Sequence, residues 1–152
     1  MSPGHIQGAQ STYRTMQVLR AIAGQLGKGV SLAYITQQTT LSKPTVHRLL
    51  QALMAEGMVE RSDEEGYFLG PECYALGVIA NQRYGLSQIA STPVARIAAD
   101  TGDSAFFSLR SEWHSICLIR EDGSYPIKTH VLQPGTRLPL GVGGGGIAML
   151  AA

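Results

Sequence analysis

The amino-acid sequence predicts an α+β protein, and three observations support this fold class. Residues 11–57 carry apolar side chains at helical spacing, residues 58–69 contain two short strand candidates, and residues 104–132 contain three longer ones. The connections between these later candidates are short, which favours antiparallel pairing, and segregated helices and antiparallel strands are typical of the α+β class. With 152 residues, the chain can form one medium domain or two small ones.

Composition excludes several classes of protein. No apolar run reaches the roughly 18 residues that a membrane span needs, and the N-terminus lacks the layout of a secretory signal, so a cytoplasmic location is expected. Cys73 and Cys117 are far apart and have no partner at CxxC spacing, which favours free thiols over a disulfide or a zinc site. Residues 1–10 show no periodicity and are expected to form a flexible arm.

Charge is distributed very unevenly along the chain. All 11 acidic residues lie from Glu56 onward, so residues 1–55 contain no Asp or Glu. The cations of this acid-free segment are Arg14, Arg20, Lys28, Lys43 and Arg48. An unopposed positive field attracts polyanions such as the phosphate backbone of DNA.

Two helices are predicted before residue 40. The first begins near Ser11, has apolar residues at i, i+3 and i+4 spacing, and ends at the "GKG" of residues 27–29. Its apolar positions are Met16, Leu19, Ile22, Ala23 and Leu26. The second is "SLAYITQQT", for which Ser31 supplies the N-cap.

A third helix is predicted within "LSKPTVHRLL", residues 41–50, and ends at Gly57. Pro44 is tolerated only in a first turn, so this helix begins at Ser42 or Lys43. The predicted inner face is formed by Val46, Leu49, Leu50 and Leu53. The predicted outward face carries Thr45, His47, Arg48 and Gln51.

A hairpin follows the third helix. Its strand candidates are Met58 to Arg61 and Tyr67 to Leu69, joined by a polar turn that contains Gly66. Two helices, a tight turn, a third helix and a hairpin are the order of elements in a winged helix-turn-helix. In that motif the N-terminal end of the last helix enters the major groove of DNA, and its free N–H groups favour a nearby phosphate.

These considerations give a set of candidate DNA-binding residues. Ser42, Lys43 and Thr45 are nearest to phosphates or base edges, and Pro44 makes the helix begin sharply. His47 and Arg48 lie one turn further along, and Gln51 follows on the same face. The flanking backbone or minor groove is the expected contact of Arg14, Arg61 and Tyr67.

Residues 71–132 have a different organisation. Residues 71–85 read as a connector helix that opens at Pro71, with apolar positions on one face. A further helix over residues 86–101 contains Pro93, where it is expected to kink or restart. The strand candidates are "SAFFSLR", "SICLIRED" and "YPIKTHVL", which predict an antiparallel meander.

Four segments together resemble the IclR family of bacterial transcriptional regulators. They are "SKPTVHRLLQALMAEGMVER", "GYFLGP", the "LG" of the connector, and "GTRLPLGVGGGGIAMLAA", and the resemblance runs from Ser11 to Ala152. It implies a winged helix-turn-helix DNA-binding domain over residues 11–70, a linker helix over 71–85 that takes part in dimerisation, and the N-terminal portion of a GAF-like effector-binding domain over 86–152.

The resemblance also implies partners. Family members bind operator DNA as homodimers or dimers of dimers, act as repressors or activators, and respond to a small organic acid or aromatic metabolite. The family's effector domain extends beyond the segment matched here, and the last helix pattern, "IAMLAA", has no C-cap, so the sequence is expected to be cut short.

The glycine run "GVGGGG", residues 141–146, matches GxGxxG literally. The dinucleotide fingerprint needs a βαβ unit and a later acidic residue, and a P-loop needs a lysine where Ile147 stands. Two interpretations stay open: a tight strand-to-helix turn with positive φ, or a cradle for an effector carboxylate formed by the N–H groups of Gly145, Gly146 and Ile147. The family commonly has a polar residue and a lysine in this segment.

No catalytic or metal site is predicted. The histidines at 5, 47, 114 and 130 lack metal-ligand spacing, and the neighbours Asp103 and Ser104 point to opposite faces of a strand, which excludes a triad with His114. No cofactor is expected either. The favoured hypothesis is a ligand-responsive DNA-binding regulator; the alternatives are a winged-helix protein-interaction module without DNA binding and a nucleotide-dependent enzyme, which depends on the glycine run alone.

Overall fold

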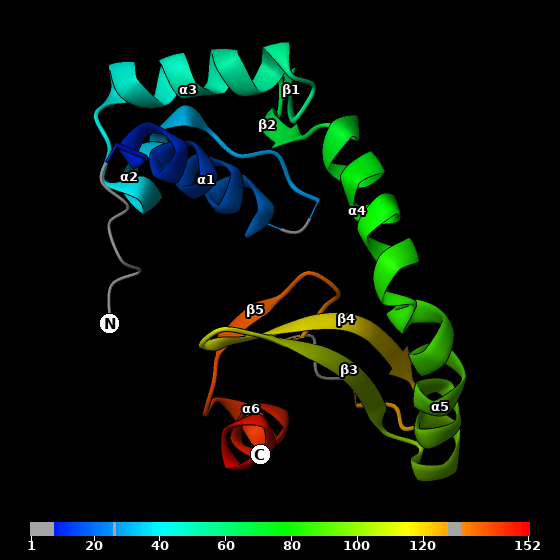
Figure 1. Cartoon of the computed structure of the whole chain (residues 1–152). Coiled ribbons are helices and arrows are strands. Elements are labelled where there is room, and N and C mark those ends of the chain that lie inside the picture. Colours follow the sequence, from blue (N-terminus) through cyan, green and yellow to red (C-terminus); the bar gives the residue numbers. More distant parts are fainter. Residues whose placement is uncertain (1–7, 26, 128–131) are drawn as a thin grey trace. The chain divides into compact units, whose positions relative to one another are not determined.

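A computed structural model of the chain describes residues 8–25, 27–127 and 132–152 (Figure 1). Most of the expected N-terminal arm, residues 1–7, lies outside the described residues. The chain divides into two compact units, Met1–Ile79 and Ala80–Ala152. No helix of the described part is long and apolar enough to cross a membrane.

The first unit contains the three predicted helices, α1 (Gln10–Ala23), α2 (Leu32–Thr39) and α3 (Lys43–Ala55). The Ser31 hydroxyl caps α2 by accepting the Tyr34 N–H at 3.1 Å, as predicted. The helix α3 begins at Lys43 and has Pro44 in its first turn, also as predicted, and Ser42 is its N-cap residue. Gly57, with a φ of 66°, follows the end of α3.

The predicted hairpin is formed by β1 (Val59–Ser62) and β2 (Gly66–Leu69), which pair antiparallel. We call residues 59–69 the wing. Val30 adds a third backbone segment, because its N–H and carbonyl bond those of Tyr67 at 3.0 and 2.9 Å. Gly66 has a φ of +99°, and a Cβ at this position would collide with the Val30 carbonyl oxygen. A side chain at position 66 would therefore disrupt this pairing.

One hydrophobic core holds the helices and the wing together. Its buried members are Val18, Ile22, Val30, Ile35, Val46, Leu50, Leu53, Val59 and Tyr67. Both strands of the wing and all three helices of this unit contribute to the cluster. The position of α3 relative to the wing is consequently fixed by shared packing.

The predicted connector is α4 (Pro71–Tyr84), which contains the boundary between the two units. Its apolar side chains are largely exposed; Tyr74 and Ile79 retain 79% and 63% of their accessible surface. Only Cys73, whose thiol donates to the Met58 carbonyl at 3.2 Å, is half-buried among the described side chains of this helix. The apolar positions predicted to share one face are thus not covered in the single chain.

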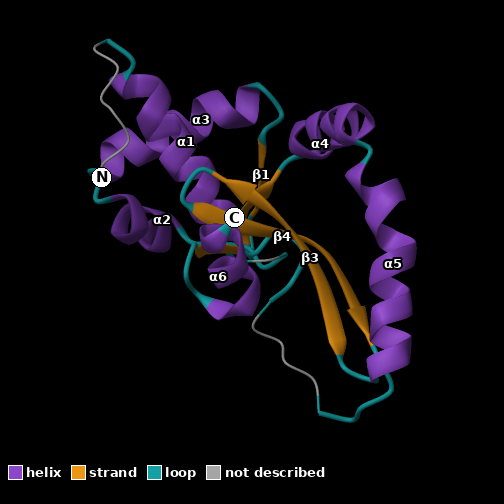
Figure 2. Cartoon of the chain, turned by 60° about the horizontal axis from the view of Figure 1, so that its bottom comes forward, coloured by secondary structure: helices purple, strands orange, loops and turns teal. Residues whose placement is uncertain are grey.

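The second unit packs α5 (Leu86–Thr101) against one face of a three-stranded antiparallel sheet (Figure 2). The sheet order is β3 (Ser104–Ser111), β4 (His114–Asp122) and β5 (Arg137–Pro139). Helix α5 continues through Pro93 and does not restart there. Buried small side chains make the contact: Ala90, Val94, Ala98 and Ala105.

The prediction of a third strand at residues 125–132 was wrong for the part that the structure describes. Residues 125–127 and 132 belong to no strand, and residues 128–131 lie outside the described residues. The Tyr125 N–H is bonded to the Gly102 carbonyl at 2.8 Å, and Pro126 has no N–H to donate to a ladder. The strand that pairs with β4 is instead β5, which follows a turn at Gly135.

A buried guanidinium in the second unit is paired and hydrogen-bonded. The side chain of Arg120 is 6% exposed and bonds both carboxylate oxygens of Asp122 at 3.1 and 3.2 Å. It also donates to the Leu132 carbonyl at 3.1 Å and lies over the ring of Phe106. Ser104 donates to the same carboxylate at 2.6 Å, so Asp122 accepts several hydrogen bonds at once. A buried charge is tolerated when it is paired and hydrogen-bonded in this way.

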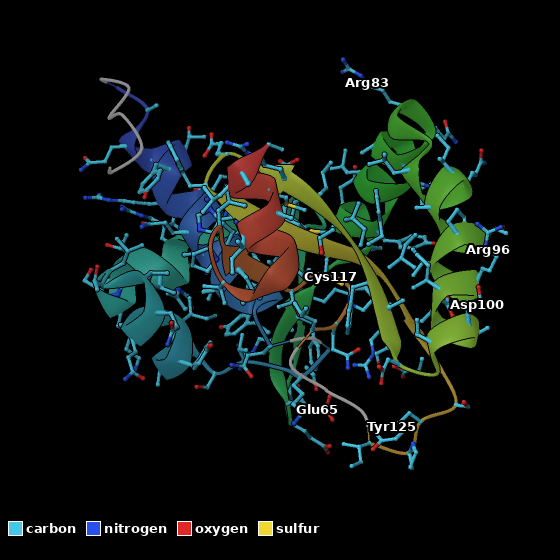
Figure 3. All side chains as sticks on the ribbon, turned by 90° about the horizontal axis from the view of Figure 1, so that it is seen from below. Glu65, Arg83, Arg96, Asp100, Cys117 and Tyr125 are labelled. Carbon is cyan, nitrogen blue, oxygen red and sulfur yellow. The ribbon has the colours of Figure 1, made fainter. Side chains whose placement is uncertain are left out.

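The two thiols are expected to differ in reactivity. Cys117, in the second unit (Figure 3), is 1% exposed, and burial raises the pKa of its thiol despite the nearby Arg120. Burial also raises the pKa of the Cys73 thiol, but this side chain is only partly covered. Because only accessible thiolates react, an aromatic disulfide reagent at neutral pH should label Cys73 slowly and Cys117 only after unfolding.

The control for this prediction is Cys73→Ser, which should leave the folded chain without a reactive thiol. Mass spectrometry of the labelled chain identifies the site. Equal labelling rates for both cysteines in the folded wild type would contradict the burial of Cys117.

Candidate nucleic-acid interface

The outward face of α3 is polar and exposed. Lys43, His47, Arg48 and Gln51 are all exposed, whereas Val46 and Leu50 are completely buried. This division confirms the predicted inner and outer faces, except that Leu49 of the inner face and Thr45 of the outer face are each half-buried. The helix therefore presents two cations and two further polar side chains to solvent from one rigid element.

The N-terminal turn of α3 offers free hydrogen-bonding groups. The Val46 N–H donates to the Ser42 carbonyl at 3.0 Å, so the N–H groups before it have no acceptor within the helix. The Ser42 and Thr45 hydroxyls are 2.8 Å apart and bond each other, and Ser42 does not cap the helix with its side chain. Free N–H groups, two hydroxyls and Lys43 at a helix N-terminus suit an anionic ligand such as phosphate.

The turn between α2 and α3 contains a residue that the sequence did not single out. Thr40 has a left-handed conformation, with a φ of 55°, and its hydroxyl donates to the Thr39 carbonyl at 2.7 Å. Thr39 is itself buried, and its hydroxyl donates to the Ile35 carbonyl at 2.7 Å. Positive φ is uncommon in threonine, and only the three-dimensional structure reveals it here.

The flanking candidates are placed differently from one another. Arg14 is half-buried on α1, and Arg61 is exposed on β1. Tyr67 is only 6% exposed and belongs to the core, so its side chain has little surface for a direct DNA contact. The Arg61 guanidinium lies over the Tyr67 ring, 5.8 Å from its centroid, and approaches the Asp63 carboxylate at 3.9 Å.

The wing itself is acidic. Its exposed carboxylates are Glu60, Asp63, Glu64 and Glu65. In Figure 3 the labelled Glu65 projects away from the ribbon. The helices α1 to α3, in contrast, contain no acidic residues. We therefore expect polyanions to be attracted to these helices and, within residues 56–70, to Arg61, the one cation of that segment.

The glycine run forms the start of α6 (Gly143–Ala151). The helix begins earlier than the carboxylate cradle requires, because the N–H groups of Gly146 and Ile147 lie beyond its first turn and only Gly145 lies within it. Gly141 and Gly143 have φ values of 88° and 71°, as a tight strand-to-helix turn requires. The preceding strand β5 pairs antiparallel, which does not fit a dinucleotide-binding βαβ unit.

Metal binding and triad catalysis find little support in the described residues. They contain no group of three His, Cys, Asp or Glu side chains that could hold a metal ion. Ser104 bonds Asp122, and Asp103 is not its hydrogen-bond partner, so the set of Asp103, Ser104 and His114 is not assembled as a triad.

The first unit is similar to a known family of DNA-binding domains. Residues 11–63 match the family model of the IclR helix-turn-helix domain. The HTH-type transcriptional regulator BhcR of Paracoccus denitrificans is 29% identical over 145 residues, which are 95% of this chain and 51% of that protein. The DNA-binding transcriptional repressor YiaJ of Escherichia coli is 31% identical over 114 residues, which are 74% of this chain and 40% of that protein. The chain thus spans about half the length of these relatives.

A solved structure shares the fold across both units. It is an IclR homologue from Microbacterium hydrocarbonoxydans, crystallised in complex with 4-hydroxybenzoate, with a TM-score of 0.72 and 18% sequence identity. The match covers 93% of this chain and 58% of that structure.

Proposed function

Because the chain belongs to the IclR family of transcriptional regulators, we propose that it binds operator DNA sequence-specifically through the N-terminal half of α3. The observation that carries this proposal is the exposed, acid-free face of α3, which is mounted on the same core as the wing. A helix of this kind can enter the major groove, where each base pair has a distinct pattern of donors and acceptors.

The proposed contacts follow from the exposure of each side chain. Lys43, Ser42 and Thr45 bind phosphates near the first turn of α3, and Pro44 fixes where that turn begins. Base edges are read by His47, Arg48 and Gln51. Arg14 and Arg61 contact the flanking backbone.

The second unit has a different proposed role. Residues 86–152 are the N-terminal portion of an effector-binding domain, and residues 71–85 are a linker helix through which two chains pair as a homodimer. The exposed apolar side chains of α4 support the pairing. An effector that binds one of two dimer geometries more tightly would shift the population that is competent for DNA binding.

The effector that we propose is a small organic acid or aromatic metabolite. The Microbacterium homologue was crystallised with 4-hydroxybenzoate, which is an aromatic carboxylate, and this complex supports the proposed class of effector. Gly145, Gly146 and Ile147 were the predicted carboxylate ligands, and Gly145 has the free first-turn N–H that this role needs.

An electrophoretic mobility shift with DNA from upstream of the chain's own gene tests the proposal. With non-specific competitor present, we expect retained binding that weakens steeply with salt. If Arg14, Lys43 and Arg61 each neutralise a phosphate, the logarithm of the binding constant falls against that of salt with a slope of about −3 per protomer. Failure of the folded chain to bind any duplex would favour the alternative of a protein-interaction module.

A further inference from the structure

The inference concerns Arg61, the single cation of the wing. The other exposed charged residues of the hairpin are all acids, and the phosphate backbone is repelled by acids. Contact between the wing and DNA therefore depends on where the Arg61 guanidinium is held. A freely rotating guanidinium would spend much of its time near the carboxylates of its own hairpin.

Tyr67 is placed to hold this guanidinium. Arg61 and Tyr67 lie directly opposite each other in the β1–β2 ladder, so their side chains share one face of the hairpin. The Arg61 Cζ is 5.8 Å from the centroid of the Tyr67 ring, within the range of a cation–π interaction. The carboxylate of Asp63 is also near, at 3.9 Å, but both members of this ion pair are largely exposed, which makes the pair weak.

The Tyr67 ring is a rigid platform. Tyr67 is 6% exposed and belongs to the core. Its backbone is hydrogen-bonded to Val30 on one side and paired with β1 on the other. A guanidinium resting on a fixed ring loses less freedom when it binds DNA than one on an unsupported side chain. The core of the unit thus holds in place the ring over which the Arg61 guanidinium lies.

We propose that Tyr67 is a positioning residue for DNA binding, which acts by holding Arg61 and does not itself touch DNA. The proposal rests on the proposed function. It adds to that function a residue, Tyr67, that affects DNA binding only through Arg61. The sequence pattern predicts a contact between Tyr67 and the flanking backbone or minor groove. In this proposal the buried ring instead supports the Arg61 side chain, which makes the contact with DNA.

A double-mutant cycle on the full chain tests this coupling. The variants are Tyr67→Leu, Arg61→Ala and the double substitution, and the probe is a fluorescein-labelled duplex from upstream of the chain's own gene, measured by anisotropy at two salt concentrations. We expect Tyr67→Leu to weaken binding about two- to fivefold when Arg61 is present. In the Arg61→Ala background the same substitution should have little effect, because no guanidinium is left to position.

Three further variants separate positioning from stability. Tyr67→Phe keeps the ring and should retain the affinity of the wild type. Arg61→Lys keeps the charge but lacks the planar guanidinium, and should lose part of the affinity. Val59→Ala is the matched control: Val59 is buried on the same face of β1, so its loss weakens the hairpin without removing the ring, and should act equally in both Arg61 backgrounds.

The outcomes are distinct. Circular dichroism establishes whether each variant is folded at the assay temperature. If Tyr67→Leu is unfolded, the affinities of Arg61→Lys and Tyr67→Phe decide whether Tyr67 has the positioning role. Equal weakening by Tyr67→Leu in both backgrounds, or no effect of Arg61→Ala, overturns the positioning role while leaving the proposed function intact. Full affinity in Arg61→Lys, or a loss in Tyr67→Phe, also overturns it. Wild type that binds no duplex removes both.

Discussion

Replacing Arg48 by alanine should reduce affinity for the operator by ~1–3 kcal/mol and relax discrimination between bases at one position. Arg48 is exposed on the outward face of α3, and the helix beneath it is anchored by the completely buried Val46 and Leu50. An arginine in the major groove donates two hydrogen bonds to a guanine, so its truncation removes contacts that a wrong base pair cannot make. Anisotropy titrations with the upstream duplex and with single-base variants of it measure both effects.

Two substitutions serve as comparisons for Arg48→Ala. Lys43→Ala should weaken binding to all duplexes alike and make the salt slope shallower by about 1, because a phosphate contact carries no sequence information. Arg20→Ala removes an exposed cation of the same acid-free segment that lies on α1 and outside the proposed contacts, and should change affinity little. Small and equal effects of Arg48→Ala and Lys43→Ala would argue against α3 as the reading helix.

The other large effect is expected in the core of the first unit. Leu50→Ala should lower the free energy of unfolding by ~2–5 kcal/mol, because Leu50 is fully buried and its truncation loses both apolar burial and packing. Urea denaturation of the full chain, followed by circular dichroism, measures the shift in midpoint. Since Leu50 lies on the inner face of α3, partial unfolding would also remove DNA binding.

The neighbouring position supplies the control for Leu50→Ala. Gln51 is exposed, and Gln51→Ala should change the free energy of unfolding by at most ~0.5 kcal/mol. A shift for Leu50→Ala as small as that for Gln51→Ala would contradict the packing of α3 onto this core.

Elements with strong local signals were predictable from the sequence. The Ser31 cap, Pro44 in the first turn of α3 and the glycine-containing turn of the wing each constrain the backbone within a few residues. The outward face of α3 followed from helical periodicity in the same way. These features account for the fold class and for most of the candidate interface.

Features that depend on distant partners were not predictable. The strand β5 is three residues long and is defined by its pairing with β4, whereas residues 125–132 have the stronger local strand pattern. The carboxylate cradle of Gly145, Gly146 and Ile147 assumed a helix start later than Gly143, because no capping side chain marks the start of α6 within a run of glycines. The burial of Tyr67 depends on packing against α1 to α3, since an aromatic residue in a four-residue strand suits either face.

The geometry of Gly66 has a consequence for how the wing can change over evolutionary time. The positive φ and the closeness of the Val30 carbonyl leave no room for a side chain at this position, whereas Asp63, Glu64 and Glu65 beside it are exposed. Hairpin shape and hairpin charge are therefore encoded at different codons. Mutation and selection can retune the attraction of this hairpin to DNA, one acidic codon at a time, while the glycine at position 66 preserves its architecture.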